Sequence, residues 1–308
     1  MKYFSLIQQN GFTWINVTRQ SEKELKELGT RFDLLLEDVE KCYPPFQRPK
    51  FLKRADYYFL ILHFPVFNRE TKHMEFTEVD CFLSSTFLIT IHDGTLLPID
   101  TFFKESKKLE KNEIPWFQDS AARILFELWH YITEDIFASL HHMTEDINAI
   151  DRRVFKETPT KQLLEEILRL KTNVVTFRRV MQGHRNILDR LVMLSGRELG
   201  LSSLQWQITS VKEYIGEVWS TLETQKESIN ALHETNESII NLRTNEVMKV
   251  LTGISVVTFP LTLLATVFAI RAPGTPFIES AVGFWIIFGL IIIGAIGMVV
   301  MFKRRKWL

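Results

Sequence analysis

The sequence predicts an α+β domain followed by a long helical stalk and a two-helix transmembrane hairpin. Short strand and helix patterns alternate at first, and an apolar heptad stripe then continues for more than four repeats. Two uncharged apolar runs follow, Val250 to Ile270 and Ala281 to Phe302. Runs of roughly twenty residues span a ~30 Å hydrocarbon core as helices. We expect, in order, an α/β domain over 1–116, a helical segment over 117–200, a stalk helix over 201–249, membrane helices over 250–270 and 281–302 joined by a loop over 271–280, and a basic tail over 303–308.

Composition narrows the class of protein. The chain has 308 residues, 46% of them hydrophobic, and a formal net charge of zero. It is long enough for one substantial globular domain besides the hairpin, and its charge argues against a nucleic-acid binder. The opening M-K-Y-F-S-L-I-Q-Q-N lacks the apolar core of a secretory signal, so we expect the residues before 250 to be cytosolic. No phosphate loop, nucleophile elbow or H-E-x-x-H occurs, so the sequence does not predict an enzyme.

The N-terminal domain should contain three aromatic and β-branched strands. They are expected over Thr13 to Val17, Ala55 to Phe67 and Asp80 to Asp93. Ser21 followed by Glu24 is a capping box and predicts a helix that continues to about Phe32.

Cysteines and histidines offer few ligand candidates. Cys42 and Cys81 lack metal-ligand spacing and are expected as buried free thiols. His63 is expected as a hydrogen-bonded core histidine, and His92 with Asp93 as a solvated turn. Two i, i+4 pairs could hold a cation on a helix face, although such pairs are usually solvated: His141 with Glu145 and His142 with Asp146.

Long helices follow the N-terminal domain. Asp119 is the expected N-cap of a helix that continues to about Glu157, where Pro159 ends it. A second helix is expected from Thr160 to about Ser195, with a turn over Gly196 to Ser203.

The stalk is predicted from a stripe with alternating spacings of four and three. Its positions are Val211, Ile215, Val218, Leu222, Gln225, Ile229, Leu232, Asn236, Ile239 and Arg243. Continued into the membrane as far as Ile270, this would be one helix of about 90 Å. Pro260 removes a backbone hydrogen bond, which Thr258 or Thr262 could compensate. The polar stripe positions either specify register, as in a coiled coil, or would wet the interior of a channel.

Charges at the ends of the hairpin predict its orientation. Arg243 and Lys249 precede the first apolar run, and four cations follow the second, Lys303 to Lys306. By the positive-inside rule, both ends of this multi-pass protein should face the cytoplasm and the loop should face outward.

Polar residues in the first membrane run share one helical face. Ser255, Phe259, Thr262 and Thr266 recur at intervals of four, three and four residues. Several copies could bring this face together around an axis and enclose a pore. The alternative is that the hydroxyls only bond back to carbonyls of their own helix.

Several motifs together resemble one family. T-N-E-V-M-K-V-L-T at Thr244 to Thr252, F-P-L-T at Phe259 to Thr262, the second apolar run and the terminal K-R-R-K-W-L are similar to those of the CorA family of divalent-cation channels. The resemblance implies a homopentameric funnel in the membrane, conducting and binding divalent cations without another cofactor. It places Met248, Leu251 and Phe259 in a hydrophobic constriction. The residues it implies along the pore are Asn245, Met248, Leu251, Ser255, Phe259, Thr262 and Thr266.

The chain departs from the family at the outer mouth of the pore. Family members end the first helix with Gly-Met-Asn, and zinc-handling relatives with Gly-Val-Asn, whereas Ala269, Ile270 and Arg271 stand here. One arginine against a divalent ion ~10 Å away in water costs somewhat under 1 kcal/mol, so a ring of five would weaken cation access. Alternatively, Arg271 snorkels to the headgroups or pairs with Glu279. We therefore expect a divalent-cation channel, with Mg²⁺ as the first candidate; a carrier of another metal or an anion, and a non-conducting sensor or scaffold, are the alternatives.

Overall fold

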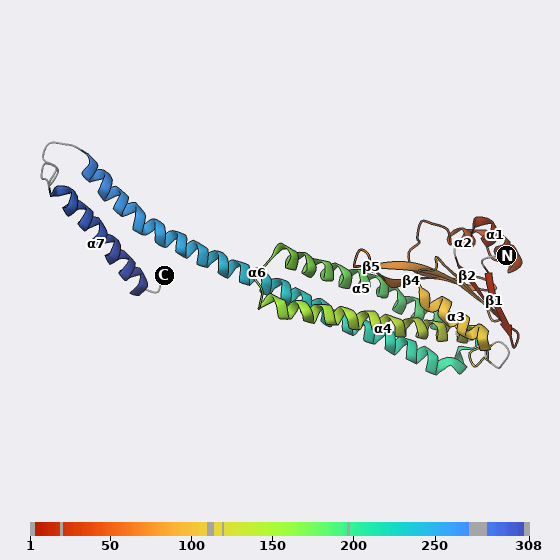
Figure 1. Ribbon diagram of the computed structural model, residues 1–308. Coiled ribbons are helices and arrows are strands. Elements are labelled where there is room, and N and C mark those ends of the chain that lie inside the picture. The colour runs from red at the N-terminus through yellow and green to blue at the C-terminus, as the bar shows by residue number, and fades with distance from the viewer. Residues whose placement is uncertain are drawn as a thin grey trace. The chain divides into compact units, whose positions relative to one another are not determined.

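The computed structural model describes residues 4–18, 21–109, 114–118, 120–195, 198–270 and 282–304 (Figure 1). They divide into two compact units, Met1–His233 and Glu234–Leu308. The first unit combines a β-sheet with long helices. The second unit contains the C-terminal part of one of these helices and a further apolar helix.

The sheet of the first unit has six strands in the order β1-β2-β6-β5-β4-β3. The strands are β1 (Phe4–Gln9), β2 (Phe12–Thr18), β3 (Lys50–Lys53), β4 (Tyr58–Asn68), β5 (His73–Leu83) and β6 (Phe87–His92). Only β2 and β6 pair in parallel in the described sheet. The strand expected from Asp80 to Asp93 is two strands, because the chain reverses where Ser84 N–H donates to Phe87 O at 2.9 Å.

Two short helices cover one face of the sheet. They are α1 (Glu22–Arg31) and α2 (Leu36–Glu40). The predicted capping box is present, because the Ser21 side chain accepts from Glu24 N–H and the Glu24 side chain accepts from Ser21 N–H. Leu25 and Val39 pack there with Phe59 in one buried cluster.

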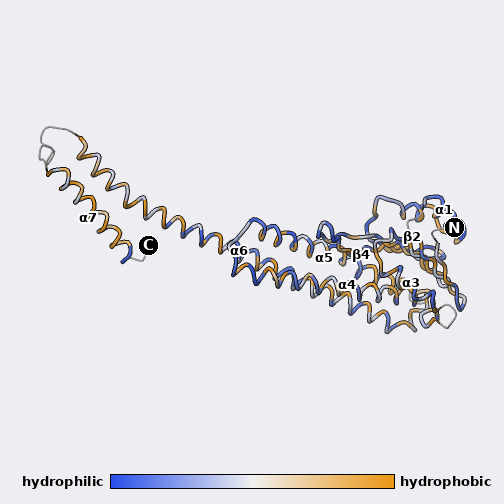
Figure 2. Tube along the Cα trace, in the orientation of Figure 1, coloured by the Kyte–Doolittle hydropathy of each residue, from blue (hydrophilic) through white to orange (hydrophobic). Residues whose placement is uncertain are grey.

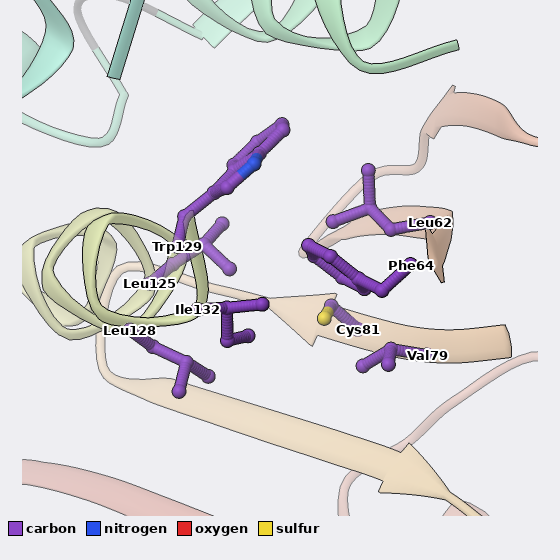
Figure 3. A pocket seen from close by; sticks show the side chains of 8 residues that line it. All are labelled: Leu62, Phe64, Val79, Cys81, Leu125, Leu128, Trp129 and Ile132. Carbon is purple, nitrogen blue, oxygen red and sulfur yellow. The ribbon is translucent and has the colours of Figure 1, made fainter. Parts of the chain in front are cut away.

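The opposite face of the sheet packs against long helices (Figure 1). They are α3 (Leu97–Leu109), α4 (Ala121–Val154) and α5 (Lys161–Ser195). Figure 3 shows a small apolar pocket where β4 and β5 meet α4. It is lined by Leu62, Phe64, Val79, Cys81, Leu125, Leu128, Trp129 and Ile132. Both cysteines are free and buried, as predicted; burial raises the pKa of the Cys81 thiol, which therefore serves as core.

The long helices match their expected extents closely. α4 begins after the N-cap Ser120, while the expected cap Asp119 lies outside the described residues. A 3-10 turn, η1 (Leu201–Leu204), precedes α6 (Gln205–Ala269). The 65 residues of α6 join the expected stalk and first membrane run in one uninterrupted helix.

From Val211 to Asn236 the predicted stripe on α6 is buried within a single copy, whereas Arg243 at its end is exposed. Val211, Val218 and Leu222 have no exposed surface, and Gln225 is 4% exposed. Gln225 Nε2 donates to Leu140 O at 2.9 Å and to Thr144 Oγ1 at 2.8 Å on α4. Of the two alternatives, the one in which Gln225 wets a channel is therefore wrong, because α4 of the same chain covers this side of α6.

The second unit is a helical hairpin. Figure 2 shows the C-terminal part of α6 and α7 (Gly283–Arg304) as almost continuously hydrophobic. The two helices lie side by side and antiparallel (Figure 1). A Cβ added to Gly294 would lie 3.5 Å from Leu261 Cδ2, an ordinary van der Waals distance, so the backbone of α7 approaches α6 at this point.

Candidate functional site

The apolar residues of the hairpin lie on its surface. Leu263 is 65% exposed, Trp285 67% and Ile293 73%. Both helices are long and apolar enough to cross a membrane by length and composition. A continuous apolar surface of this kind is unfavourable in water and matches a hydrocarbon environment.

The contact between Leu261 and Gly294 sets the register of the hairpin. In antiparallel helices of equal rise, each residue back along α6 is matched by one forward along α7. Gly253 is then level with Phe302, and both are buried, which supports the register.

This register also sets the height of the apolar layer. Leu251 is level with Arg304, and Ile270 is level with Trp285. The rise from Leu251 to Ile270 is about 28 Å, close to the hydrocarbon thickness of a bilayer. Aromatic Phe284 and Trp285 mark one end and basic residues mark the other, as is typical of the two membrane interfaces.

The predicted pore face points away from α7. At roughly 100° per residue, the seven predicted positions lie roughly 80° to 200° around α6 from Leu261. Ser255 is partly exposed and the other six are exposed. Phe259 is the most exposed of its apolar members, at 73%. The described residues of a single copy thus leave this face uncovered and available for self-association.

Hydroxyl groups form a ladder along the first membrane helix. Ser255 Oγ donates to Leu251 O at 2.9 Å, Thr258 Oγ1 to Ile254 O at 2.8 Å and Thr262 Oγ1 to Thr258 O at 2.9 Å. Thr266 Oγ1 donates to Thr262 O at 2.8 Å. Each hydroxyl proton is directed at the helix backbone, which leaves oxygen lone pairs for whatever approaches from outside.

Pro260 lies inside α6 without ending it. Proline has no N–H, so the carbonyl of Val256 loses its i+4 backbone donor. Thr258 and Thr262 donate to Ile254 and Thr258 instead. The expectation that the hydroxyl of Thr258 or Thr262 would replace the hydrogen bond lost by the Val256 carbonyl is therefore wrong.

The divergent outer motif is only partly described. Ala269 is the last residue of α6, and Ile270 N–H donates to Val267 O at 3.3 Å. Arg271 and the whole expected loop over 271–280 lie outside the described residues.

Metal-binding clusters are absent from the described ranges, in which no three His, Cys, Asp or Glu side chains gather suitably. The expected pair His141 and Glu145 is 3.4 Å apart and exposed. His142 also lies near Glu145, at 3.4 Å, instead of the expected Asp146. These residues therefore form a solvated helix surface.

Two other histidines belong to the core of the first unit. His63 Nε2 lies 2.7 Å from Gln47 O, which confirms its prediction as a hydrogen-bonded histidine. His184 accepts from Trp129 Nε1 at 3.2 Å, and its Nε2 lies 2.5 Å from His63 O, so it joins α4, α5 and β4. Burial lowers the pKa of His184 to about 4, which keeps the ring neutral.

His92 corrects the expectation of a solvated turn. It is only 2% exposed, and its Nε2 lies 3.1 Å from Asn16 Oδ1. Gly94 N–H donates to its Nδ1 at 3.2 Å, so the ring is neutral with its proton on Nε2. Burial lowers the pKa of His92. Of the predicted turn residues His92 and Asp93, only Asp93 is exposed. His92 thus closes the core where β6 ends.

Comparison with known proteins agrees with this architecture. A cobalt/magnesium transport protein CorA of Thermotoga maritima is 25% identical over 300 residues, which cover 96% of this chain and 83% of the relative. The solved CorA magnesium transporter of Methanocaldococcus jannaschii has a TM-score of 0.82 at 17% identity, covering 98% of this chain and 93% of that one. The full-length CmaX protein has a TM-score of 0.75 at 18% identity, covering 99% and 97%.

The predicted fold is therefore confirmed, and the match to a family of transporters confirms the expectation of a transport protein rather than an enzyme. Residues 9–304 match the family described as CorA-like Mg2+ transporter protein. The chain belongs to the CorA family.

Proposed function

We propose that five copies of this chain form a channel for divalent metal cations, with Mg²⁺ as the first substrate. The observation that carries the proposal is the hydroxyl-bearing face of α6, exposed and turned away from α7. In the proposed assembly this face surrounds the axis and α7 packs outside. Both termini lie in the cytoplasm, in keeping with the basic end of the hairpin.

The direction of the hydroxyl bonds favours cations over anions. An anion needs hydrogen-bond donors, whereas the hydroxyls of Ser255, Thr262 and Thr266 already donate to backbone carbonyls. Their remaining lone pairs accept hydrogen bonds from the water shell of a cation. A wall without carboxylates suits Mg²⁺, which gives up its hydration water reluctantly.

Apolar residues on the same face supply a gate. Met248, Leu251 and Phe259 are 54%, 56% and 73% exposed in one copy. Gathered around an axis, they exclude water when the pore is narrow. Phe259→Ala should therefore raise the leak of Mg²⁺ severalfold, and an unchanged flux would remove Phe259 from the constriction.

The decisive experiment measures Mg²⁺ flux into liposomes that contain the purified protein. Arg271→Asn is assayed beside it, with Co²⁺, Zn²⁺ and Cl⁻ as further tracers. We expect Mg²⁺ flux in the natural protein and faster flux in the variant, because neutralising the ring removes repulsion of a few kcal/mol before screening. Cross-linking in the same membranes should yield species up to five copies.

The other outcomes identify the alternatives. Flux of a different metal or of Cl⁻, with none of Mg²⁺, would assign the channel to that ion. Absence of all flux, restored by Gly-Met-Asn at positions 269–271, would favour a non-conducting sensor or scaffold derived from a channel. The Thermotoga maritima relative is named for both cobalt and magnesium, so the two metals are compared at equal concentration.

A further inference from the structure

Three cations lie at nearly the same height at one end of the hairpin. Lys303 and Arg304 form the last turn of α7, and both are exposed. In the register set by Leu261 and Gly294, Lys303 is level with Thr252 of α6. Lys249 lies about one turn beyond Thr252, so the three cations occupy a layer only about 5 Å deep.

The charges in this layer have little internal compensation. None of the three cations has an ion pair within the part of the chain that the structure describes. Arg243 adds a fourth exposed cation further along α6, and Glu246 is the carboxylate between Arg243 and Lys249. The local excess is therefore about three positive charges.

The surface next to these cations is apolar. Val299, Val300 and Met301 precede Lys303 on α7 and are 47%, 47% and 50% exposed. A cationic edge directly above an apolar wall fits a molecule with a negative head and a hydrocarbon tail. Free inorganic phosphate would use only the cationic edge, whereas a phospholipid would use both parts.

We propose that Lys249, Lys303 and Arg304 bind the phosphate group of anionic phospholipids, whose acyl chains lie against the end of α7. The three residues are placed at the height where the apolar layer ends and the headgroups begin. Lysine and arginine reach such groups while their stems remain against apolar surface. The surface acts independently of ion flux, so it does not depend on the proposed channel activity.

Lipid-dependent thermal stability of the full chain tests this binding. Phosphatidylglycerol is titrated into detergent micelles that contain the protein, and phosphatidylcholine and inorganic phosphate are titrated in parallel. We expect only phosphatidylglycerol to raise the melting temperature, with an effect that weakens as salt is added. The variant K249Q/K303Q/R304Q should need about a hundredfold more phosphatidylglycerol, roughly fivefold for each cation lost.

Two variants serve as controls. K107Q/K108Q removes two exposed cations at the end of α3 and should respond as the natural protein does. K303R/R304K keeps the charge and should also respond fully. An equal response of the triple variant, or an equal effect of phosphatidylcholine or inorganic phosphate, would overturn the proposal.

If the triple variant folds poorly, a second measurement still tests the proposal. In that case the natural protein is titrated with phosphatidylglycerol at low and high salt. Stabilisation that does not depend on salt would exclude headgroup binding by these cations, whereas a salt-sensitive effect restricted to phosphatidylglycerol would support it.

Discussion

Polar side chains have different hydrogen-bond partners in the two units. In the first unit, polar groups join different elements: Gln225 of α6 bonds to Thr144 of α4, and His184 of α5 bonds to Trp129 of α4. In the second unit, the hydroxyls of Ser255 and Thr262 donate to carbonyls of their own helix. Polar groups therefore join separate elements in the first unit, whereas these hydroxyls of the second unit stay within one helix.

The same substitution in both units should have very different effects. Ile229 on α6 is 1% exposed and Ile296 on α7 is 59% exposed. Ile229→Ala should cost about 2–5 kcal/mol, because it leaves a cavity in a packed core. Ile296→Ala should cost under about 1 kcal/mol. Thermal denaturation in one detergent compares them, and equal losses would contradict the contrast between the units.

Acid should weaken the first unit through His184. Its folded pKa of about 4 lies below the unfolded value of about 6.5, so the unfolded chain binds the proton first. Stability is full above pH 6.5 and falls by about 3 kcal/mol as the pH drops to 4. Melting temperatures across this range test the effect.

His184→Gln is the matched control for this pH dependence. Glutamine can accept from Trp129 and donate to the His63 carbonyl without titrating. The variant should therefore lose part of the acid sensitivity. Other groups, including buried His92, still make stability depend on pH in this variant. Identical slopes in both proteins would show that His184 does not protonate on unfolding in this range.

Two helical glycines should respond with opposite signs. A Cβ at Gly183 would lie 2.9 Å from Pro49 Cβ, so Gly183→Ala should cost about 1–3 kcal/mol through overpacking. A Cβ at Gly294 would lie 3.5 Å from Leu261 Cδ2. Gly294→Ala should cost nothing and gain up to about 1 kcal/mol from helix propensity. Melting temperatures distinguish the two, and a larger loss at Gly294 would reverse the expectation.

Local signals in the sequence predicted much of the fold. The capping box at Ser21 and the heptad stripe beginning at Val211 each correspond to observed elements. The stripe did not reveal its partner, because periodicity defines a buried face without naming what covers it. A channel interior was therefore one of the two predicted surroundings of Gln225, which lies against α4.

Features that depend on distant residues could not be predicted in this way. His92 is buried because Asn16, on the parallel neighbouring strand, meets it across 76 positions of sequence. The contact of Leu261 with Gly294 has no signal beyond the presence of a glycine. The pore face remains a prediction, although its spacing agrees with a surface turned away from α7.

The height of the apolar layer determines which bilayer thickness suits the hairpin. An apolar layer of about 28 Å nearly equals a bilayer of ordinary thickness, so the helices need little tilt and deform little lipid. In a bilayer several ångströms thicker, the apolar layer of the hairpin would be shorter than the hydrocarbon core. The cationic end would then lie closer to the acyl chains. Hydrophobic mismatch would then cost fractions of a kcal/mol per ångström for each copy of the chain. Acyl-chain length is thus a variable to which this protein should be sensitive.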